Sequence, residues 1–128
     1  MKSFTDLEAW RCGMNLVKEV YVLTKRLPKE EQYGLTSQLR RAAVSILANL
    51  AEGFNRSSDA DKAHKYVIAR GECAEVEALL LVTVELEYFA TSAVQHALEL
   101  SQQTGRLLWG LIRAYSPTDP RPRPIPRP

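Results

Sequence analysis

The chain has 128 residues, of which 45% are hydrophobic and 25% are charged, and its formal net charge is +2. These are ordinary values for one globular domain, and no apolar run reaches the length of a membrane span. The N-terminus lacks a basic segment followed by an apolar core, so no secretion signal is evident and we expect a cytoplasmic protein. The two cysteines, Cys12 and Cys73, lack the spacing of a metal site and are predicted to be buried free thiols.

The excess of positive charge lies at the C-terminus. Residues 116–128 hold three arginines and one aspartate, which leaves residues 1–115 with 14 basic and 14 acidic side chains. Because residues 1–115 have no net charge, an extended phosphate-binding surface is not expected unless basic and acidic side chains gather in different places. Some segregation is visible, because residues 72–87 carry five glutamates and no basic side chain, whereas residues 40–56 carry three arginines and one glutamate.

The first predicted helix opens with a capping box, in which Thr5 caps the helix and the Glu8 side chain reaches back to it. Apolar residues then repeat at helical spacing until Pro28 ends the helix. A short connection, residues 29–34, follows, and its Gly34 suits a backbone with positive φ.

The second predicted helix, residues 35–54, is unusually rich in apolar side chains. At 100° per residue its apolar arc spans roughly 200°, about twice the width that packing against one core requires. We therefore expect one part of the arc to pack on the chain's own bundle and the other part on a neighbouring subunit. The remaining strip is polar or small and consists of Arg41, Ser45, Ala48, Glu52 and Asn55.

Two further helices complete the pattern. Ser58 caps the third, which covers about residues 59–88. The fourth opens at Thr91 or Ser92. Four helices joined by short links predict an all-α, antiparallel up-down-up-down four-helix bundle over residues 1–115.

The third predicted helix contains a segment, residues 78–84, that is apolar on every side. Such a segment is expected to be buried all round. It is either bundle core with cover from a loop or a second subunit interface, and we favour the interface because the second helix shows the same excess. The predicted subunit interface comprises Arg40, Val44, Leu47, Ala51, Leu79 and Leu80.

Two neighbouring arginines on the second helix have different expected roles. Arg40 lies at the edge of the apolar arc, where its guanidinium must reach solvent or a carboxylate of the third helix. A salt bridge between helices or subunits is favoured there over a phosphate contact. Arg41 lies near the centre of the polar strip, so we assign it, together with Arg56, to contact with a partner or nucleic acid. Asn49, on the other shoulder of the arc, is expected to bond a helix end or a neighbour's backbone.

Residues 116–128 form a separate segment, in which six prolines are interspersed with arginines. This composition cannot form a helix or a sheet and favours polyproline II. The segment is a flexible solubilising tail, a ligand for proline-binding domains or an arginine arm that touches RNA. The arginines available for such a contact are Arg121, Arg123 and Arg127.

The sequence contains no pattern typical of an enzyme. A di-iron site in a bundle needs Glu-x-x-His on two helices, whereas His64 follows Asp61 and His96 follows Ala93 at that spacing. Phosphate-binding glycine loops and zinc-protease motifs are also lacking. We therefore expect no catalytic residues, no metal and no cofactor, and both histidines are expected near the surface.

Three stretches of the chain form a specific pattern: FTDLEAW at residues 4–10, YGLTSQLRRAAVSI at residues 33–46 and ANLAEG at residues 48–53. Together they resemble the bacterial four helix bundle protein family. That family includes proteins encoded in intervening sequences of large-subunit ribosomal RNA genes, and it is related to the accessory variability determinant of diversity-generating retroelements. The family usually has proline where this chain has Leu47, which implies a straighter second helix here.

The resemblance implies a homopentamer of four-helix bundles arranged as a barrel. For the retroelement relatives it also implies binding to a reverse transcriptase and to nucleic acid. We therefore expect a non-enzymatic, oligomeric scaffold, with a pentamer favoured, that binds RNA or an RNA-associated protein such as a reverse transcriptase. The alternative is a protein–protein interaction module without a nucleic-acid role. No membrane partner is expected.

Overall fold

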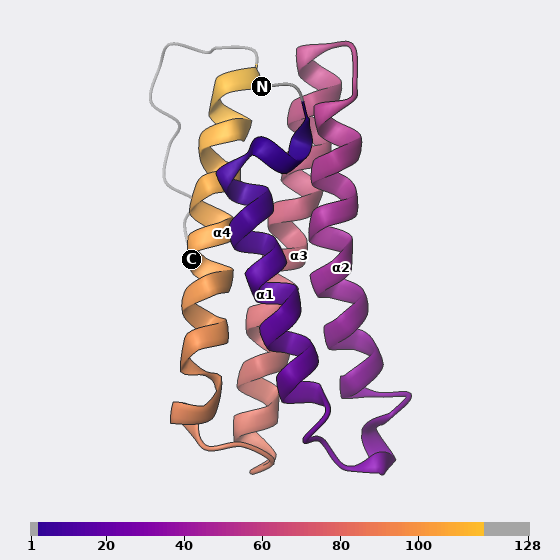
Figure 1. Cartoon of the computed structure of the whole chain (residues 1–128), viewed down its shortest axis with the longest axis vertical. Helices are drawn as coiled ribbons and strands as arrows, with labels where there is room; N and C mark the ends of the chain where they lie inside the picture. The colour runs from indigo at the N-terminus through magenta and orange to yellow at the C-terminus, as the bar shows by residue number, and fades with distance from the viewer. Residues whose placement is uncertain (1–2, 117–128) are drawn as a thin grey trace, which may run out of the picture.

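The computed structural model describes residues 3–116, which fold into four long helices (Figure 1). The elements in chain order are η1 (Phe4–Asp6), α1 (Glu8–Thr24), η2 (Lys29–Glu31), α2 (Leu35–Phe54), α3 (Asp59–Glu85) and α4 (Thr91–Tyr115). Each long helix packs against the next one in the chain, and α4 closes the ring against α1. The predicted all-α, antiparallel four-helix bundle is therefore confirmed. Apart from Ser116, the predicted proline- and arginine-rich tail lies outside the described residues.

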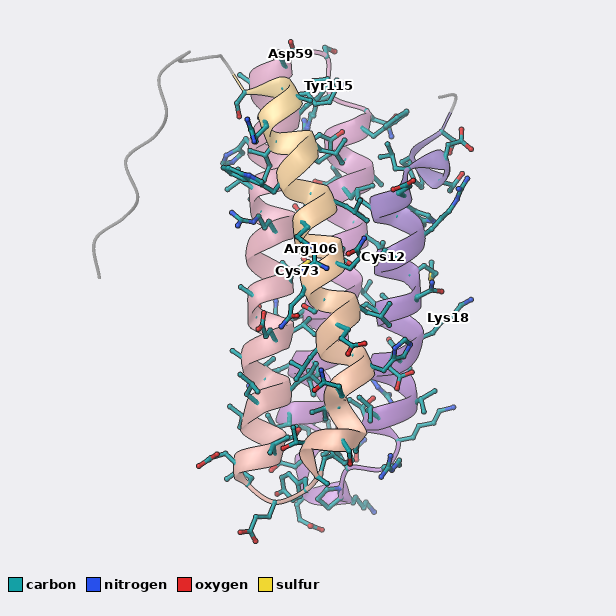
Figure 2. All side chains as sticks on the ribbon, turned by 90° about the vertical axis from the view of Figure 1, so that its left-hand side faces the viewer. Cys12, Lys18, Asp59, Cys73, Arg106 and Tyr115 are labelled. Carbon is teal, nitrogen blue, oxygen red and sulfur yellow. The ribbon has the colours of Figure 1, made fainter. Side chains whose placement is uncertain are left out.

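The antiparallel pair α3 and α4 brings the start of one helix to the end of the other. Figure 2 shows Asp59 and Tyr115 together at this shared end of the bundle. The ring centres of Tyr66 and Tyr115 lie 6.0 Å apart. Further along the pair, the Ser101 hydroxyl donates a hydrogen bond to the Cys73 carbonyl oxygen at 2.8 Å. These contacts fix the register of the two helices, on which the placement of their charges depends.

The wide apolar arc of α2 is covered largely within the chain itself. On the α1 side, Leu47 packs so close to Gly13 that a Cβ at the glycine would lie 2.9 Å from Leu47 Cδ2. On the α3 side, a Cβ at Gly53 would lie 2.7 Å from Tyr66 Cε1. Between these contacts Leu50 faces the centre of the bundle and has no exposed surface. Two neighbours in the same bundle account for most of the arc, so its width alone does not require a second subunit.

The N-terminal cap of the first helical turn differs from the prediction, whereas the cap of α3 agrees with it. Ser3, not Thr5, forms the capping box: its hydroxyl accepts from the Thr5 amide, and its own amide donates to Asp6 Oδ2. This cap belongs to η1, and α1 begins only after it. At α3, the Ser58 hydroxyl accepts from the Asp61 amide at 3.1 Å, as predicted.

Three other helix boundaries show smaller differences. α1 ends at Thr24, four residues before Pro28. α3 ends at Glu85, short of the predicted boundary near residue 88. α4 begins at Thr91, one of the two predicted start residues, and no side chain caps it. None of the four long helices is apolar over a length that could cross a bilayer.

The turn before α2 does not use the backbone freedom that was predicted for Gly34. Gly34 has a φ of −109°, which other residues also adopt. A glycine fits there for reasons of space, because a Cβ would lie 2.6 Å from Glu31 Oε1. That oxygen accepts a hydrogen bond from the Leu35 amide at the start of α2. The left-handed conformation occurs instead at Glu87, with a φ of 64°, in the turn between α3 and α4.

Candidate assembly surface and basic residues

The six residues of the predicted subunit interface occupy different environments. Leu80 has no exposed surface and Leu47 is 6% exposed, so the interface prediction is wrong for both. They belong to the core of the chain itself, because Leu80 lies on the inward side of α3 and Leu47 packs against α1. The members that reach the surface at least in part are Arg40, Val44, Ala51 and Leu79.

Arg40 is held inside the chain, at the contact between α2 and α1. Its Nε donates to Thr24 Oγ1 at 2.9 Å, and its guanidinium carbon lies 4.5 Å from the centre of the Tyr21 ring. The Thr24 hydroxyl donates in turn to the Val20 carbonyl oxygen at 2.7 Å. The expected carboxylate partner on α3 is therefore wrong. A hydroxyl and an aromatic face on α1 take its place, which gives Arg40 a structural role.

The outward side of α3 carries a cluster of exposed apolar side chains. The large ones are Val67, Leu81, Val82 and, at the C-cap of the helix, Leu86, which are 52%, 51%, 40% and 55% exposed. The small exposed residues between them are Gly71, Ala74 and Ala78. We call these seven residues the outer α3 face.

The outer α3 face excludes one of the two explanations offered for the apolar segment 78–84, that a loop of the described chain covers it, and the subunit interface stays a prediction. Leu80 and Thr83 have no exposed surface, whereas Leu81 and Val82 are among the most exposed apolar side chains of the described chain. The physical reason is that α2 and α4 flank α3 and cover only its inward and lateral sides. No loop of the described residues covers the outward side.

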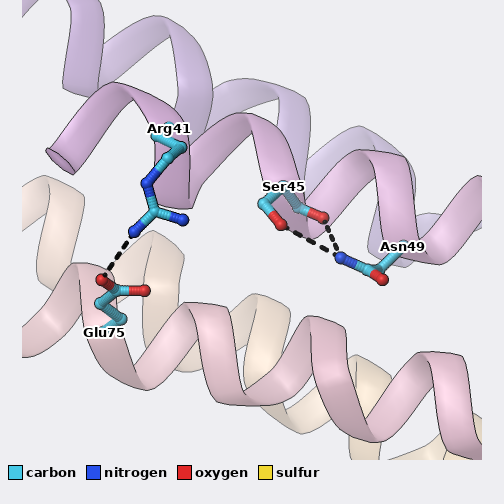
Figure 3. Close-up of polar contacts among 4 residues, drawn as sticks. All are labelled: Arg41, Ser45, Asn49 and Glu75. Atoms are coloured by element: carbon cyan, nitrogen blue, oxygen red, sulfur yellow. Dashed lines mark hydrogen bonds and ion pairs between the residues drawn. The ribbon is translucent and has the colours of Figure 1, made fainter. Parts of the chain in front are cut away.

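Arg41 lies on the surface of α2, on the polar strip where the sequence placed it. Its Nη2 is 3.2 Å from Glu75 Oε1 on α3 (Figure 3). The two side chains are 62% and 36% exposed, so water screens the pair, and such pairs contribute about 0–1 kcal/mol to stability. The contact nevertheless neutralises Arg41 locally and directs its guanidinium toward α3.

Asn49 does not bond a helix end or a neighbouring backbone, contrary to the prediction. Its side-chain nitrogen donates to the Ser45 carbonyl oxygen at 2.9 Å and to the Ser45 hydroxyl at 3.1 Å (Figure 3). Both partners lie one turn earlier on the same helix. A short polar side chain in a helix often bonds its own backbone in this way.

Glu72, which the sequence analysis did not single out, lies beside the Arg41–Glu75 pair. Its Oε2 atom is buried and has no hydrogen-bond partner within the described chain. Burial raises the pKa of Glu72, the neighbouring Glu75 carboxylate raises it further, and Arg41 opposes the change. When protonated, Glu72 can share its proton with Glu75. The only signal in the sequence was the spacing of two glutamates three residues apart on a helix.

Arg56 is exposed just after the end of α2, beside a shallow depression lined by Ala51, Glu52, Asn55 and Arg56 itself. Glu52 is engaged from the other side, because Lys65 Nζ lies 2.8 Å from its Oε2. This pairing lowers the pKa of Glu52, with a smaller contribution from Arg56. The other predicted contact residues, Arg121, Arg123 and Arg127, lie outside the described residues.

The histidines and Cys73 lie where the sequence placed them, whereas Cys12 is only half-buried. His64 and His96 are exposed on α3 and α4, and among residues 3–116 no group of histidine, cysteine and acidic side chains is arranged to hold a metal. Cys12 and Cys73 are free thiols. Burial raises the pKa of the Cys73 thiol to about 12, so this thiol stays protonated at neutral pH.

Arg70 and Trp109 form a surface stack that the sequence analysis also missed. The Arg70 guanidinium carbon lies 4.8 Å from the centre of the Trp109 ring, across the contact between α3 and α4. Trp109 is 38% exposed. The two residues are 39 positions apart, so no local pattern pairs them.

The sequence matches the family described as 23S rRNA-intervening sequence protein over residues 5–110, most of the four-helix bundle. The chain belongs to this family. The family match agrees with the resemblance of the three sequence stretches, which the bundle places in the first turns, in α2 and in the connection before it.

A solved structure supports the same fold for this chain. It is a protein of Bacteroides thetaiotaomicron VPI-5482, described as a protein with unknown function from the S23 ribosomal protein family. The two chains are 25% identical and superpose with a TM-score of 0.75, over 82% of this chain and 95% of that chain. No curated protein matches the sequence.

Proposed function

We propose that this protein is a non-enzymatic helical scaffold that assembles from several copies and holds RNA or an RNA-associated protein such as a reverse transcriptase. The observation that carries the proposal is the outer α3 face. Monomeric soluble proteins rarely expose a large contiguous apolar patch, and such a patch typically marks an interaction site.

The shape of the outer α3 face suits helix packing between copies. Gly71, Ala74 and Ala78 are small, so the backbone of another helix can approach closely along this line. Val67 and Leu81 stand at either side of them and offer apolar area to bury. Val44 on the neighbouring helix α2 is also exposed and offers a further apolar side chain. A closed ring, with a pentamer favoured by the family resemblance, would bury this surface in every copy.

The RNA part of the proposal is supported by the family, whose description refers to the intervening sequence of 23S rRNA. Within the bundle, Arg56 is exposed and available for a partner. The C-terminal segment adds Arg121, Arg123 and Arg127, and a ring of several copies would multiply these weak contacts.

A second candidate is a protein-interaction module without a nucleic-acid role. It is favoured by the way in which basic side chains of α2 and α3 are engaged within the chain. Arg40 bonds Thr24, Arg41 pairs with Glu75, and Lys65 pairs with Glu52. Basic side chains that are held or paired within the chain in this way add little to phosphate binding.

Light scattering on the full-length protein tests the assembly. We expect a mass of several times the 14.4 kDa chain. Leu81→Glu places a charge on the outer α3 face and should reduce the mass to that of one chain while leaving helicity intact. Val22→Glu on α1 is the matched control, because Val22 is equally exposed but lies on another helix, and it should leave the mass unchanged. A wild-type protein that scatters as a monomer would refute the assembly.

Titration with single-stranded RNA separates the two candidates. If the scaffold binds RNA, binding should be measurable at about 50 mM salt and should weaken steeply as salt is added. Removal of residues 116–128 should then reduce the slope of log affinity against log salt, because three arginines are lost. Absence of binding at low salt would leave the protein-interaction module as the function.

A further inference from the structure

The antiparallel register of α3 and α4 brings together two parts of the sequence that lack acidic residues. Residues 62–71 carry three basic side chains and no Asp or Glu, and residues 100–116 carry two and likewise no Asp or Glu. Lys62 Nζ lies 5.7 Å from the centre of the Tyr115 ring. The Arg70–Trp109 stack confirms that the two runs lie side by side. The part of the α3/α4 face that these two runs form is therefore basic, although the bundle as a whole is neutral and Asp59 and Asp61 lie next to it in the first turn of α3.

Three of these five basic side chains remain available at the surface. Lys62 donates to the Phe54 carbonyl oxygen at 2.6 Å, and Lys65 is paired with Glu52. The available side chains are Arg70, Arg106 and Arg113, all exposed. Figure 2 shows Arg106 on α4, on the stretch of helix that leads to Tyr115.

Trp109 lies at the centre of this basic surface and has open space beside it. Arg106 and Arg113 lie about one helical turn before and after it, on the same outward side of α4. Gly105 also precedes Trp109 by one turn, and a Cβ there would meet nothing within 4 Å. The same is true of Gly110, the next residue. Arg70 thus stacks on the indole ring, and neither Gly105 nor Gly110 places a side chain beside it.

Building on the proposed RNA role, we propose that Trp109, backed by Arg70 and flanked by Arg106 and Arg113, stacks on an unpaired base of single-stranded RNA. Base–aromatic stacking contributes to single-strand binding because every base has a flat π-face. Guanidinium groups stack on bases and also bind phosphates, so one strand can satisfy the aromatic ring and the three arginines together.

The charges favour RNA over a second copy of the chain as the occupant. Two copies meeting through this surface about a two-fold axis would bring Arg70, Arg106 and Arg113 against the same three arginines. Like charges across an interface cost several kcal/mol. The outer α3 face, by contrast, is apolar and suits contact between copies, so the two surfaces have separable roles.

Binding of a fluorescein-labelled oligouridine to the full-length protein tests the site. At about 50 mM salt, Trp109→Ala should weaken binding about tenfold through the loss of stacking, whereas Trp109→Phe should recover part of the affinity. Lys18→Gln, on the exposed side of α1 (Figure 2), is the matched control: it removes a charge without touching the site and should change the affinity little. Circular dichroism confirms that each variant is folded, and Arg70→Gln provides a second variant that leaves the indole in place.

Intrinsic fluorescence gives an independent measurement. Trp109 emission should be quenched by the bound base, whereas Trp10, whose ring packs 4.8 Å from that of Phe4 in the bundle, should change little. The quenching should therefore disappear in Trp109→Phe.

Four outcomes would overturn the proposal, and they differ in what else they affect. Equal affinities for Trp109→Ala, Lys18→Gln and the wild type would remove this site while leaving the RNA role intact. Equal binding of a duplex RNA would exclude stacking on an unpaired base. A reduced mass of Trp109→Ala in light scattering, with unchanged RNA affinity, would make this surface a contact between copies. No binding by the wild type would refute the RNA role itself.

Discussion

Helices α2 and α3 carry the same excess of apolar surface in the sequence, yet the fold treats the two differently. On α2 the wide arc is divided between α1 and α3, so Leu39, Ile46 and Leu50 have no exposed surface. On α3 one inward stripe is buried, and Leu81 and Val82 remain outside. The width of an apolar arc therefore shows how many neighbours a helix has. It does not show whether those neighbours belong to the same chain.

Close approach explains why α2 is covered so completely. Gly13 on α1 admits Leu47, and Gly53 on α2 admits Tyr66 of α3. Each glycine lacks a Cβ at a point where two helices touch, so α1 and α3 can both pack closely against α2. The glycine on the outward side of α3, Gly71, has no such neighbour within the chain. Its surroundings are open to another molecule.

The largest expected difference between the two helices concerns their leucines. Leu47→Ala should lower the free energy of unfolding by about 2–5 kcal/mol at any protein concentration, because it leaves a cavity against α1. Leu81→Ala should act only through association, so its effect should grow with protein concentration. Urea denaturation of both variants at several concentrations measures this difference. A large, concentration-independent loss for Leu81→Ala would place that side chain in the core.

The two glycines provide a second comparison. Gly53→Ala should destabilise the fold by about 1–3 kcal/mol, because the new methyl group would overlap the Tyr66 ring and the Lys65 side chain. In the dissociated Leu81→Glu background, Gly71→Ala should stabilise the chain by about 0.5–1 kcal/mol, since alanine has the higher helix propensity and nothing of the same chain lies within 4 Å of the added Cβ. Thermal melts followed by circular dichroism show whether each variant is more or less stable than its parent protein. Stabilisation by Gly53→Ala would show that α2 and α3 do not approach as closely as described.

The smallest expected difference lies within α2, between its inner and outer edges. Arg40→Ala should lower stability by about 1–2 kcal/mol, because it removes the bond to Thr24 and the contact with the Tyr21 ring. Arg41→Ala should leave the melting temperature nearly unchanged, since its pair with Glu75 is exposed. If Arg41→Ala lowered the melting temperature more than Arg40→Ala, the assignment of the inward and outward sides of α2 would be wrong.

The sequence by itself determined the elements of the bundle. Helical spacing of apolar residues, the Ser58 cap and the short connections located all four helices to within a few residues, because these signals act within one or two turns. The same local signals placed Arg40 at an apolar edge and Arg41 on the polar strip. They failed at the first cap, where Ser3 and Thr5 both offer a hydroxyl oxygen that can accept from an amide at the start of a helix.

Only the tertiary structure decided which surfaces are inside and which charges meet. Leu47 and Leu80 belong to the core because of where α1 and the centre of the bundle lie, and no periodicity contains that information. Arg70 and Trp109 are brought together by the register of α3 against α4. The physical reason is that helix propensity and amphipathicity are properties of neighbours in sequence. Burial and electrostatics depend on neighbours in space, and these are set by the packing of whole helices.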